Sequence, residues 1–269
     1  MLAIDPTARV APSAVIGSEV KIGPYCVIGP NVSVGDGCEL VAQVHLTGHT
    51  TIGAGTVIYP FASLGTPPQS VNYRGGPTRL TVGANCQIRE HVTMNTGTED
   101  GGGITTVGDD CFFMVGSHVA HDCQVGSHVL FANNVVIGGH VEIGDHTFLG
   151  GHCVVLQRIK IGDNVMISGN TSTRDDVVPF GYVMYATARL VGVNLVGMKR
   201  RGFSRPAIHA VRAAYRGIFE SEGIFAERVA RVEAEFGSFP EVARMIAFLR
   251  ASRRPMQTKP HGHNPDITD

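Results

Sequence analysis

The sequence predicts a mainly β fold in which short strands stack into a solenoid, followed by a small α-helical domain. Three features support this prediction. An aliphatic residue recurs every six positions over much of the chain, all six cysteines occupy one position of that repeat, and helical patterns begin only past residue 194. A unit of six residues cannot bury its own apolar side chain, so such units must stack on one another.

The repeat begins at Ile4 and runs, with two interruptions, to Ile167. Glycine often follows the aliphatic residue, where it relieves the backbone at a bend. We expect each hexad to form one short strand and one turn, with the aliphatic residue pointing inward. The period alone fixes the hexad. A resemblance to left-handed hexapeptide-repeat β-helices implies that three hexads, or about 18 residues, close each coil.

The cysteines test this register, because all of them stand four residues after a repeat aliphatic. They are Cys26, Cys38, Cys86, Cys111, Cys123 and Cys153. A free cysteine in a small inward position behaves as a small hydrophobic residue. We therefore expect neither disulfides nor a thiolate metal site.

The domain division follows from where the repeat stops. We expect a left-handed β-helix over residues 1–193, with projecting loops at 65–81 and 97–106 where the register breaks. Residues 194–254 form the helical domain, in which Ser204 caps the first long helix and further patterns run across Phe225–Phe236 and Pro240–Leu249. The polar tail 255–269 is expected to be disordered.

Composition excludes several partners. The formal net charge of −1 gives no reason to expect nucleic acid or an anionic membrane surface. No apolar run reaches the roughly 18 residues that a membrane span needs, so we expect no membrane insertion. The N-terminus lacks a basic start and an apolar signal core, which predicts a cytoplasmic protein.

The stretch "HVAHDC", residues 118–123, concentrates the chemistry. His121 lies at a turn position, and one coil of 18 residues further on lies Gly139, so their backbones should be neighbours. Asp122 similarly faces His140. A histidine beside a carboxylate suggests an oriented general base, and a glycine N–H suggests an oxyanion donor. Acyl transfer needs both groups.

Two other interpretations stay open on the residues alone. One is that these histidines are ordinary solvated corner residues, since many histidines share the fourth hexad position. They are His49, His91, His128, His140, His146 and His152. The other is a zinc site like that of gamma-class carbonic anhydrases, in which His118 and His121 would meet His140 across coils. Those enzymes have a wider histidine spacing, which is absent here.

Longer motifs carry a more specific resemblance. "PQSVNYRGGPTRL", "AHDCQVG", "LFANNVVIGGHVEIGD" and "GVNLVGMKRRGFSR" follow one another in order over nearly the whole chain. They resemble the UDP-N-acetylglucosamine O-acyltransferases that begin lipid A synthesis. The resemblance implies a trimer with its sites between subunits. It also implies an (R)-3-hydroxyacyl donor on the phosphopantetheine of acyl carrier protein, a UDP-sugar acceptor, and no bound cofactor or metal.

The resemblance also implies roles for individual residues. His121 is the general base, Asp122 orients it and Gly139 supplies the oxyanion N–H. Further positions match substrate contacts, nucleotide contacts or the acyl groove. They are His118, His140, Gln157, Gln69, Gly169, Asn194, Arg200 and Arg201.

The chain departs from the family at several substrate positions. They are Ser70, Asn72, Asn95, Thr96, Leu156, Val196 and the segment Tyr185–Ala188. These changes spare the base and the oxyanion glycine but alter sugar and nucleotide contacts. The acceptor therefore stays open between UDP-N-acetylglucosamine and its 3-amino analogue, which would be N-acylated. A paralogue that binds without turnover is a further alternative.

Overall fold

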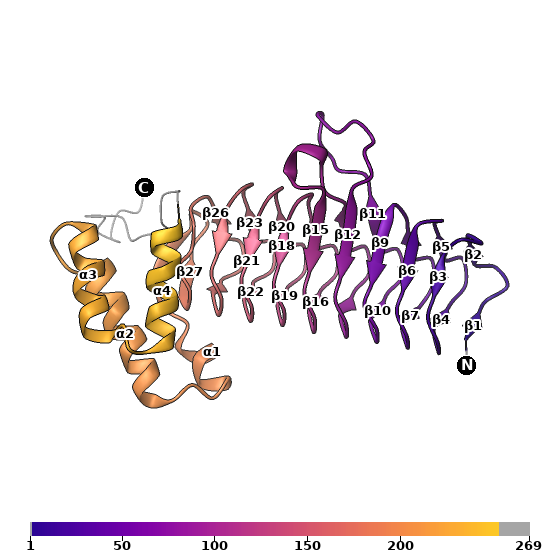
Figure 1. Ribbon diagram of the computed structural model, residues 1–269. Coiled ribbons are helices and arrows are strands. Elements are labelled where there is room, and N and C mark those ends of the chain that lie inside the picture. The colour runs from indigo at the N-terminus through magenta and orange to yellow at the C-terminus, as the bar shows by residue number, and fades with distance from the viewer. Residues whose placement is uncertain (1, 253–269) are drawn as a thin grey trace, which may run out of the picture.

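A computed structural model describes residues 2–252 and shows a three-sided parallel β-helix with helices at one end (Figure 1). Eleven strands form the first sheet, nine the second and eight the third. Consecutive strands along the chain belong to different sheets, so each coil places one strand on each side. The predicted tail at 255–269 lies outside the described residues.

The strands are short, as the hexad length requires. The first sheet contains β1 (Ala3–Ile4), β4 (Lys21–Ile22), β7 (Glu39–Leu40), β10 (Val57–Ile58), β13 (Gln87–Ile88), β16 (Phe112–Phe113), β19 (Leu130–Phe131), β22 (Phe148–Leu149), β25 (Met166–Ile167), β27 (Gly181–Met184) and β28 (Arg189–Val193). The second contains β2 (Arg9–Val10), β5 (Val27–Ile28), β8 (His45–Leu46), β11 (Ser63–Thr66), β14 (Thr93–Asn95), β17 (His118–Val119), β20 (Val136–Ile137), β23 (Val154–Val155) and β26 (Ser172–Thr173). The third contains β3 (Val15–Ile16), β6 (Val32–Val34), β9 (His49–Ile52), β12 (Arg79–Val82), β15 (Ile104–Val107), β18 (Gln124–Val125), β21 (Glu142–Ile143) and β24 (Lys160–Ile161).

The interior of the β-helix is built from the residues that the hexad pattern points inward. The repeat aliphatics from Ile22 to Ile167 are buried, and all six cysteines are buried and free, which confirms the prediction for them. Strand pairs such as Val125 with Ile143 lie one coil apart in parallel register. This stacking removes the aliphatic side chains from water, which is the main driving force for the fold.

The fourth hexad position explains why histidine is frequent on the corners. His128, His140, His146 and His152 have φ of 57°, 61°, 58° and 59°, in the left-handed region. Histidine, asparagine and aspartate enter this region more readily than most residues with a side chain. Asp122 occupies the same position with φ of 61°. The turn therefore selects these residue types for backbone reasons, whether or not they have a function.

Two loops interrupt the stacking, and both leave the second sheet and return to the third. Ile52 pairs with Val82, an offset of 82 − 52 = 30 residues instead of 18, and Val82 pairs with Val107, an offset of 107 − 82 = 25. The first loop therefore adds 12 residues and the second adds 7. The second contains the short 3-10 helix η1 (Glu99–Gly101). Figure 1 shows both loops projecting beside β11, β12 and β15.

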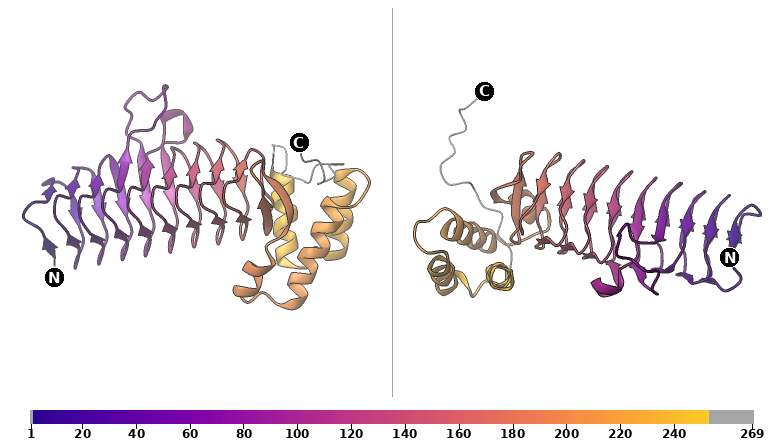
Figure 2. Two further views of the ribbon diagram at one scale, coloured as in Figure 1. Left: turned by 180° about the vertical axis from the view of Figure 1, so that it is seen from behind. Right: turned by 90° about the horizontal axis from the view of Figure 1, so that it is seen from above.

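The helical domain follows β28, the antiparallel strand that closes the first sheet. It contains α1 (Leu195–Arg200), α2 (Arg205–Phe219), α3 (Phe225–Phe236) and α4 (Pro240–Ala251), which stand at the end of the β-helix (Figure 2). The Ser204 hydroxyl accepts a hydrogen bond from the Ala207 amide, so it caps α2 as its position suggested. Among the described residues, no helix combines the length and the apolar character that a membrane span requires.

Candidate active site

The candidate site lies on the corner between the second and third sheets. His121 and Asp122 occupy the turn between β17 and β18, and one coil further on Gly139 and His140 occupy the turn between β20 and β21. The His140 amide donates to the His121 carbonyl oxygen over 2.9 Å, which is the neighbour relation that the 18-residue offset predicts. Both projecting loops leave from this same corner.

His121 and Asp122 form a hydrogen-bonded pair. The His121 Nδ1 atom lies 2.8 Å from Asp122 Oδ2. The Asp122 side chain is completely buried, whereas 17% of the His121 side chain is exposed. A buried carboxylate accepts a hydrogen bond, so Nδ1 carries the proton and Nε2 is left as a proton acceptor. This arrangement is that of an oriented general base with access from outside.

Asp122 is held ionised by its neighbours. Burial by itself raises the pKa of Asp122, but hydrogen bonds from Thr98 and His121 outweigh burial and lower the pKa below its ordinary value of 3.8. The Thr98 amide donates to Oδ1 over 2.9 Å, and the Thr98 hydroxyl donates to Oδ2 over 2.6 Å. The Asp122 amide in turn donates to the Thr105 hydroxyl. The pair therefore sits in a fully hydrogen-bonded setting.

Gly139 is packed directly against the imidazole. A Cβ atom built on Gly139 would lie 2.5 Å from Cε1 of His121 and 2.7 Å from its Nε2. Among the described residues, the Gly139 amide N–H has no hydrogen-bond acceptor. A free amide beside the base is the arrangement that an oxyanion donor requires.

The other predicted contacts at this corner surround the pair. His140 Nε2 lies 3.8 Å from Asp122 Oδ2, and burial, followed by the nearby Arg158 charge, lowers the pKa of His140. His118 projects from β17 and its Nδ1 lies 2.8 Å from the Thr93 hydroxyl. Burial lowers the pKa of His118, so its ring is favoured in the neutral form. Gln157, one coil beyond His140, is exposed, as is Gln69 in the first loop.

Three groups at this corner also resemble a metal site. One ligand atom from each of His121, Asp122 and His140 lies within 4.8 Å of the others. The His121 and Asp122 atoms that would bind an ion are instead joined by a hydrogen bond, and Thr98 donates to both carboxylate oxygens. The geometry is therefore that of a hydrogen-bonded pair, which speaks against the zinc interpretation.

A second group of predicted residues lies elsewhere on the chain. Asn194 and the two arginines, Arg200 and Arg201, line a cavity of about 660 Å³ with His128 and His146. This cavity lies against the first sheet and its corner with the third. The single chain thus does not bring these residues to His121, which stands on a different corner.

Arg201 is the most telling residue of this cavity. Its Nη1 donates to the His146 carbonyl oxygen at 3.5 Å, but its Nε and Nη2 atoms are buried with no hydrogen-bond partner among the described residues. Burial lowers the pKa of Arg201 below its ordinary value. A half-buried guanidinium with unpaired donors suits a phosphate, which accepts two hydrogen bonds side by side. Asn194 caps α1 through its amide oxygen, so it shapes the cavity.

Gly169 stands apart from both groups. It lies in the turn between β25 and β26, on the corner between the first and second sheets. A Cβ atom there would lie 3.1 Å from the Gly151 carbonyl oxygen of the preceding coil. The predicted residues thus occupy all three corners of one chain.

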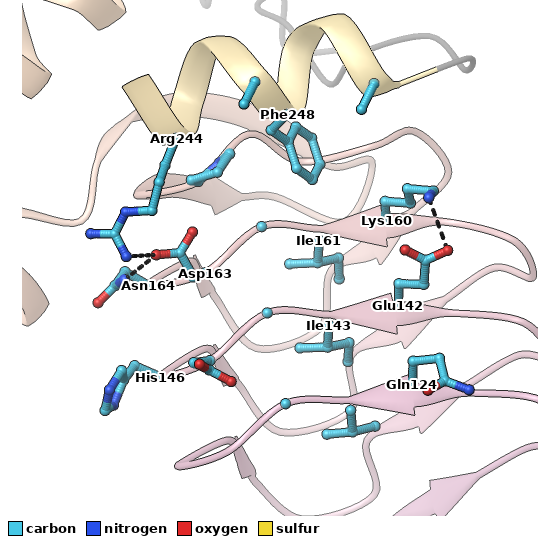
Figure 3. A pocket seen from close by; sticks show the side chains of 18 of the residues that line it. Gln124, Glu142, Ile143, His146, Lys160, Ile161, Asp163, Asn164, Arg244 and Phe248 are labelled. Atoms are coloured by element: carbon cyan, nitrogen blue, oxygen red, sulfur yellow. Dashed lines mark hydrogen bonds and ion pairs between the residues drawn. The ribbon is translucent and has the colours of Figure 1, made fainter. Parts of the chain in front are cut away.

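A larger groove of about 880 Å³ runs between α4 and the third sheet (Figure 3). None of the predicted site residues lines it. Its charged groups are already paired, Lys160 with Glu142 and Arg244 with Asp163, each over 2.9 Å. Size alone therefore does not identify the reaction site, because the groove lacks an oriented base.

Two positions where the chain departs from the family pattern hold the loops together. The Asn95 amide donates to the Thr66 hydroxyl over 2.9 Å and to the Pro67 carbonyl oxygen over 3.1 Å. The Thr78 hydroxyl donates to the Thr96 hydroxyl over 2.9 Å. Asn95 and Thr96 are buried, so their side chains support the loop bases.

Sequence reasoning did not find Thr98. It lies 24 positions before Asp122, inside the loop where the 18-residue offset no longer applies. No periodic signal could have placed it beside the carboxylate. The only hint was that a loop must bulge from the corner that also carries His121.

Comparison with known proteins fits this geometry. Residues 13–48 and 104–139 match the family of bacterial transferase hexapeptides, and residues 176–257 match domain 2 of UDP-N-acetylglucosamine O-acyltransferase. The acyl-[acyl-carrier-protein]–UDP-N-acetylglucosamine O-acyltransferase of Azorhizobium caulinodans is 56% identical over 248 residues, covering 92% of each chain. The corresponding protein of Caulobacter vibrioides is 47% identical over 256 residues, covering 95% of this chain and 97% of the relative.

The same likeness holds in three dimensions. The structure of LpxA from Acinetobacter baumannii superposes with a TM-score of 0.91 at 40% identity, covering 94% of this chain and 98% of that one. The predicted left-handed parallel β-helix with a C-terminal helical domain is therefore confirmed. The predicted family is confirmed as well, because the relatives are similar over nearly their full length. The chain belongs to the UDP-N-acetylglucosamine O-acyltransferase family and is an acyltransferase.

Proposed function

We propose that this enzyme transfers an (R)-3-hydroxyacyl chain from acyl carrier protein to the 3-hydroxyl of UDP-N-acetylglucosamine, the first step of lipid A biosynthesis. The names of its relatives give the donor and acceptor classes. The single observation that supports the chemistry is the His121–Asp122 pair packed on Gly139. No metal or bound cofactor enters the proposal, since the acyl group arrives on phosphopantetheine.

The reaction uses each group of the pair in turn. His121 Nε2 takes the proton of the acceptor hydroxyl as that oxygen attacks the thioester carbonyl carbon. The Gly139 N–H stabilises the resulting oxyanion, and Asp122 stabilises the imidazolium. Collapse of the tetrahedral intermediate breaks the carbon–sulfur bond, and the leaving thiolate receives the proton from His121.

We further propose that a complete site needs two subunits of a homotrimer. His121 and Arg201 lie on different corners of one chain, so one bound nucleotide sugar is unlikely to reach both within a single subunit. Rotation about a threefold axis would set one subunit's base against its neighbour's arginine cavity. In this arrangement Arg200 and Arg201 contact the diphosphate, and Gly169 lines the acyl groove. The cytoplasm, where we place the enzyme, is tested by cell fractionation.

The deciding experiment measures transfer from hydroxyacyl carrier proteins of several lengths to UDP-N-acetylglucosamine. His121→Ala should lower kcat by about 10²–10⁴-fold, the usual contribution of a general base, with the assembly unchanged. The 3-amino analogue should be assayed in parallel, because Ser70 and Asn72 stand in a loop of the active-site corner. Preference for that amine would reassign the acceptor. Absence of transfer to either acceptor, or wild-type activity in His121→Ala, would refute the proposal.

A further inference from the structure

We infer that Thr98 is the positioning residue of the catalytic pair, and that the seven-residue insertion carrying it serves to seal and orient Asp122. This inference rests on the proposed function. It concerns a residue that touches Asp122 and acts on the substrate only through His121.

The first step is to count the donors to the buried carboxylate. An ionised carboxylate away from water is costly unless hydrogen bonds replace the lost solvent. Asp122 accepts from His121 Nδ1, the Thr98 amide and the Thr98 hydroxyl. One residue therefore supplies two of these three hydrogen bonds. At 2.6 Å, the bond from the Thr98 hydroxyl is the shortest.

The second step is how the backbone presents this hydroxyl. Thr98 is the N-cap of η1, with φ of −111° and ψ of 157°, yet its side chain makes no capping hydrogen bond. An N-cap threonine ordinarily accepts from an amide of its own helix. Here the helix is closed through the Thr98 carbonyl oxygen, which accepts from the Gly101 and Gly103 amides. The hydroxyl is thereby free to donate to Asp122.

The third step is that the same loop covers the carboxylate. A Cβ atom on Gly101 would lie 2.1 Å from Asp122 Oδ2, and one on Gly97 would lie 2.8 Å from Oδ1. Two glycines therefore allow the loop backbone to lie directly on the carboxylate. Water is displaced, and Thr98, which is 7% exposed, takes its place as donor.

The consequence for catalysis concerns the base. Thr98 directs a positive dipole at Asp122, which disperses the carboxylate's charge and restrains its pull on the His121 proton. Without the hydroxyl, the carboxylate should hold the imidazolium more strongly. The base would then be unprotonated only at higher pH. The other titratable or charged groups that face the pair are His118, His140 and, beyond His140, Arg158.

The test is Thr98→Val in the full-length enzyme. Valine is nearly isosteric and suits the extended backbone at this position, so only the hydroxyl is lost. We expect kcat to fall about 10- to 100-fold, the size expected for a hydrogen bond to a charged group, while the KM for the UDP-sugar changes little. The acidic limb of the kcat/KM profile should move to higher pH by roughly 0.5–1 unit. Thr98→Ser, which restores the hydroxyl, should recover most of both changes.

Thr78→Val is the matched control. Thr78 is 5% exposed, lies at the base of the loops and donates to Thr96 instead of Asp122, so its loss should leave kcat and the pH profile unchanged. The inference is overturned if Thr98→Val keeps wild-type kcat and pH dependence. It is also overturned if Thr98→Ser fails to rescue, or if Thr78→Val loses as much activity. None of these outcomes touches the proposed function, which depends on wild-type turnover and on His121→Ala.

Discussion

Replacing Gly139 with alanine adds one methyl group at the point where the backbone of one coil meets the imidazole of the coil before it. The φ of Gly139 lies outside the left-handed region, so alanine can adopt the same backbone conformation. The amide N–H that we assign to the oxyanion is also kept. The substitution therefore tests the position of the His121 ring and little else.

The size of the effect follows from the distances. The new Cβ would lie 2.5 Å from His121 Cε1, whereas nonbonded carbons settle about 3.5–4.0 Å apart. The ring must therefore move by about 1 Å, and a misplacement of that size costs roughly 10²-fold in rate. The same movement strains the 2.8 Å hydrogen bond to Asp122. Overpacking should lower the free energy of unfolding by about 1–3 kcal/mol.

The assay is steady-state kcat/KM for acyl transfer, with thermal unfolding measured on the same samples. Gly151→Ala is the matched control, because Gly151 occupies the same hexad position on another corner. The nearest atom to its added Cβ is the Asn133 carbonyl oxygen at 3.4 Å. We expect near-normal activity from this control. If Gly139→Ala kept kcat/KM within twofold of wild type, the assigned position of the base would be wrong.

Two further predictions concern assembly and pH. His121→Ala and Arg201→Ala should each be inactive alone, but co-expressed they should recover about one quarter of the sites if each site draws one residue from each of two subunits. Mixed trimers, verified by mass, that stay inactive would contradict the shared site. The folded-state pKa of Asp122 lies below its unfolded value of 3.8, so its stabilising contribution is present above that pH and is lost as pH falls through the folded-state pKa. Asp122→Asn should therefore flatten the acidic side of the curve of unfolding free energy against pH, and equal slopes in urea unfolding would argue against this.

Much of the site could be predicted because the β-helix turns a one-dimensional offset into contact. Val125 pairs with Ile143 and His140 bonds to His121, each as an 18-residue coil requires. The neighbour relation between His121 and Gly139 needs only this arithmetic and the hexad register. The histidines of the fourth position show its limit, since the left-handed turn selects them without regard to function.

The amino-acid sequence by itself determined the hexad, the buried aliphatic and cysteine positions, and the coil neighbours, because these depend on a local pattern repeated along the chain. The tertiary structure decided which corner each residue occupies and what the insertions contact. Thr98 reaches Asp122 through a loop that abandons the period. Arg201 is separated from His121 because α1 packs on another side of the β-helix. Such contacts depend on the path of the whole chain through space, which a local repeat does not encode.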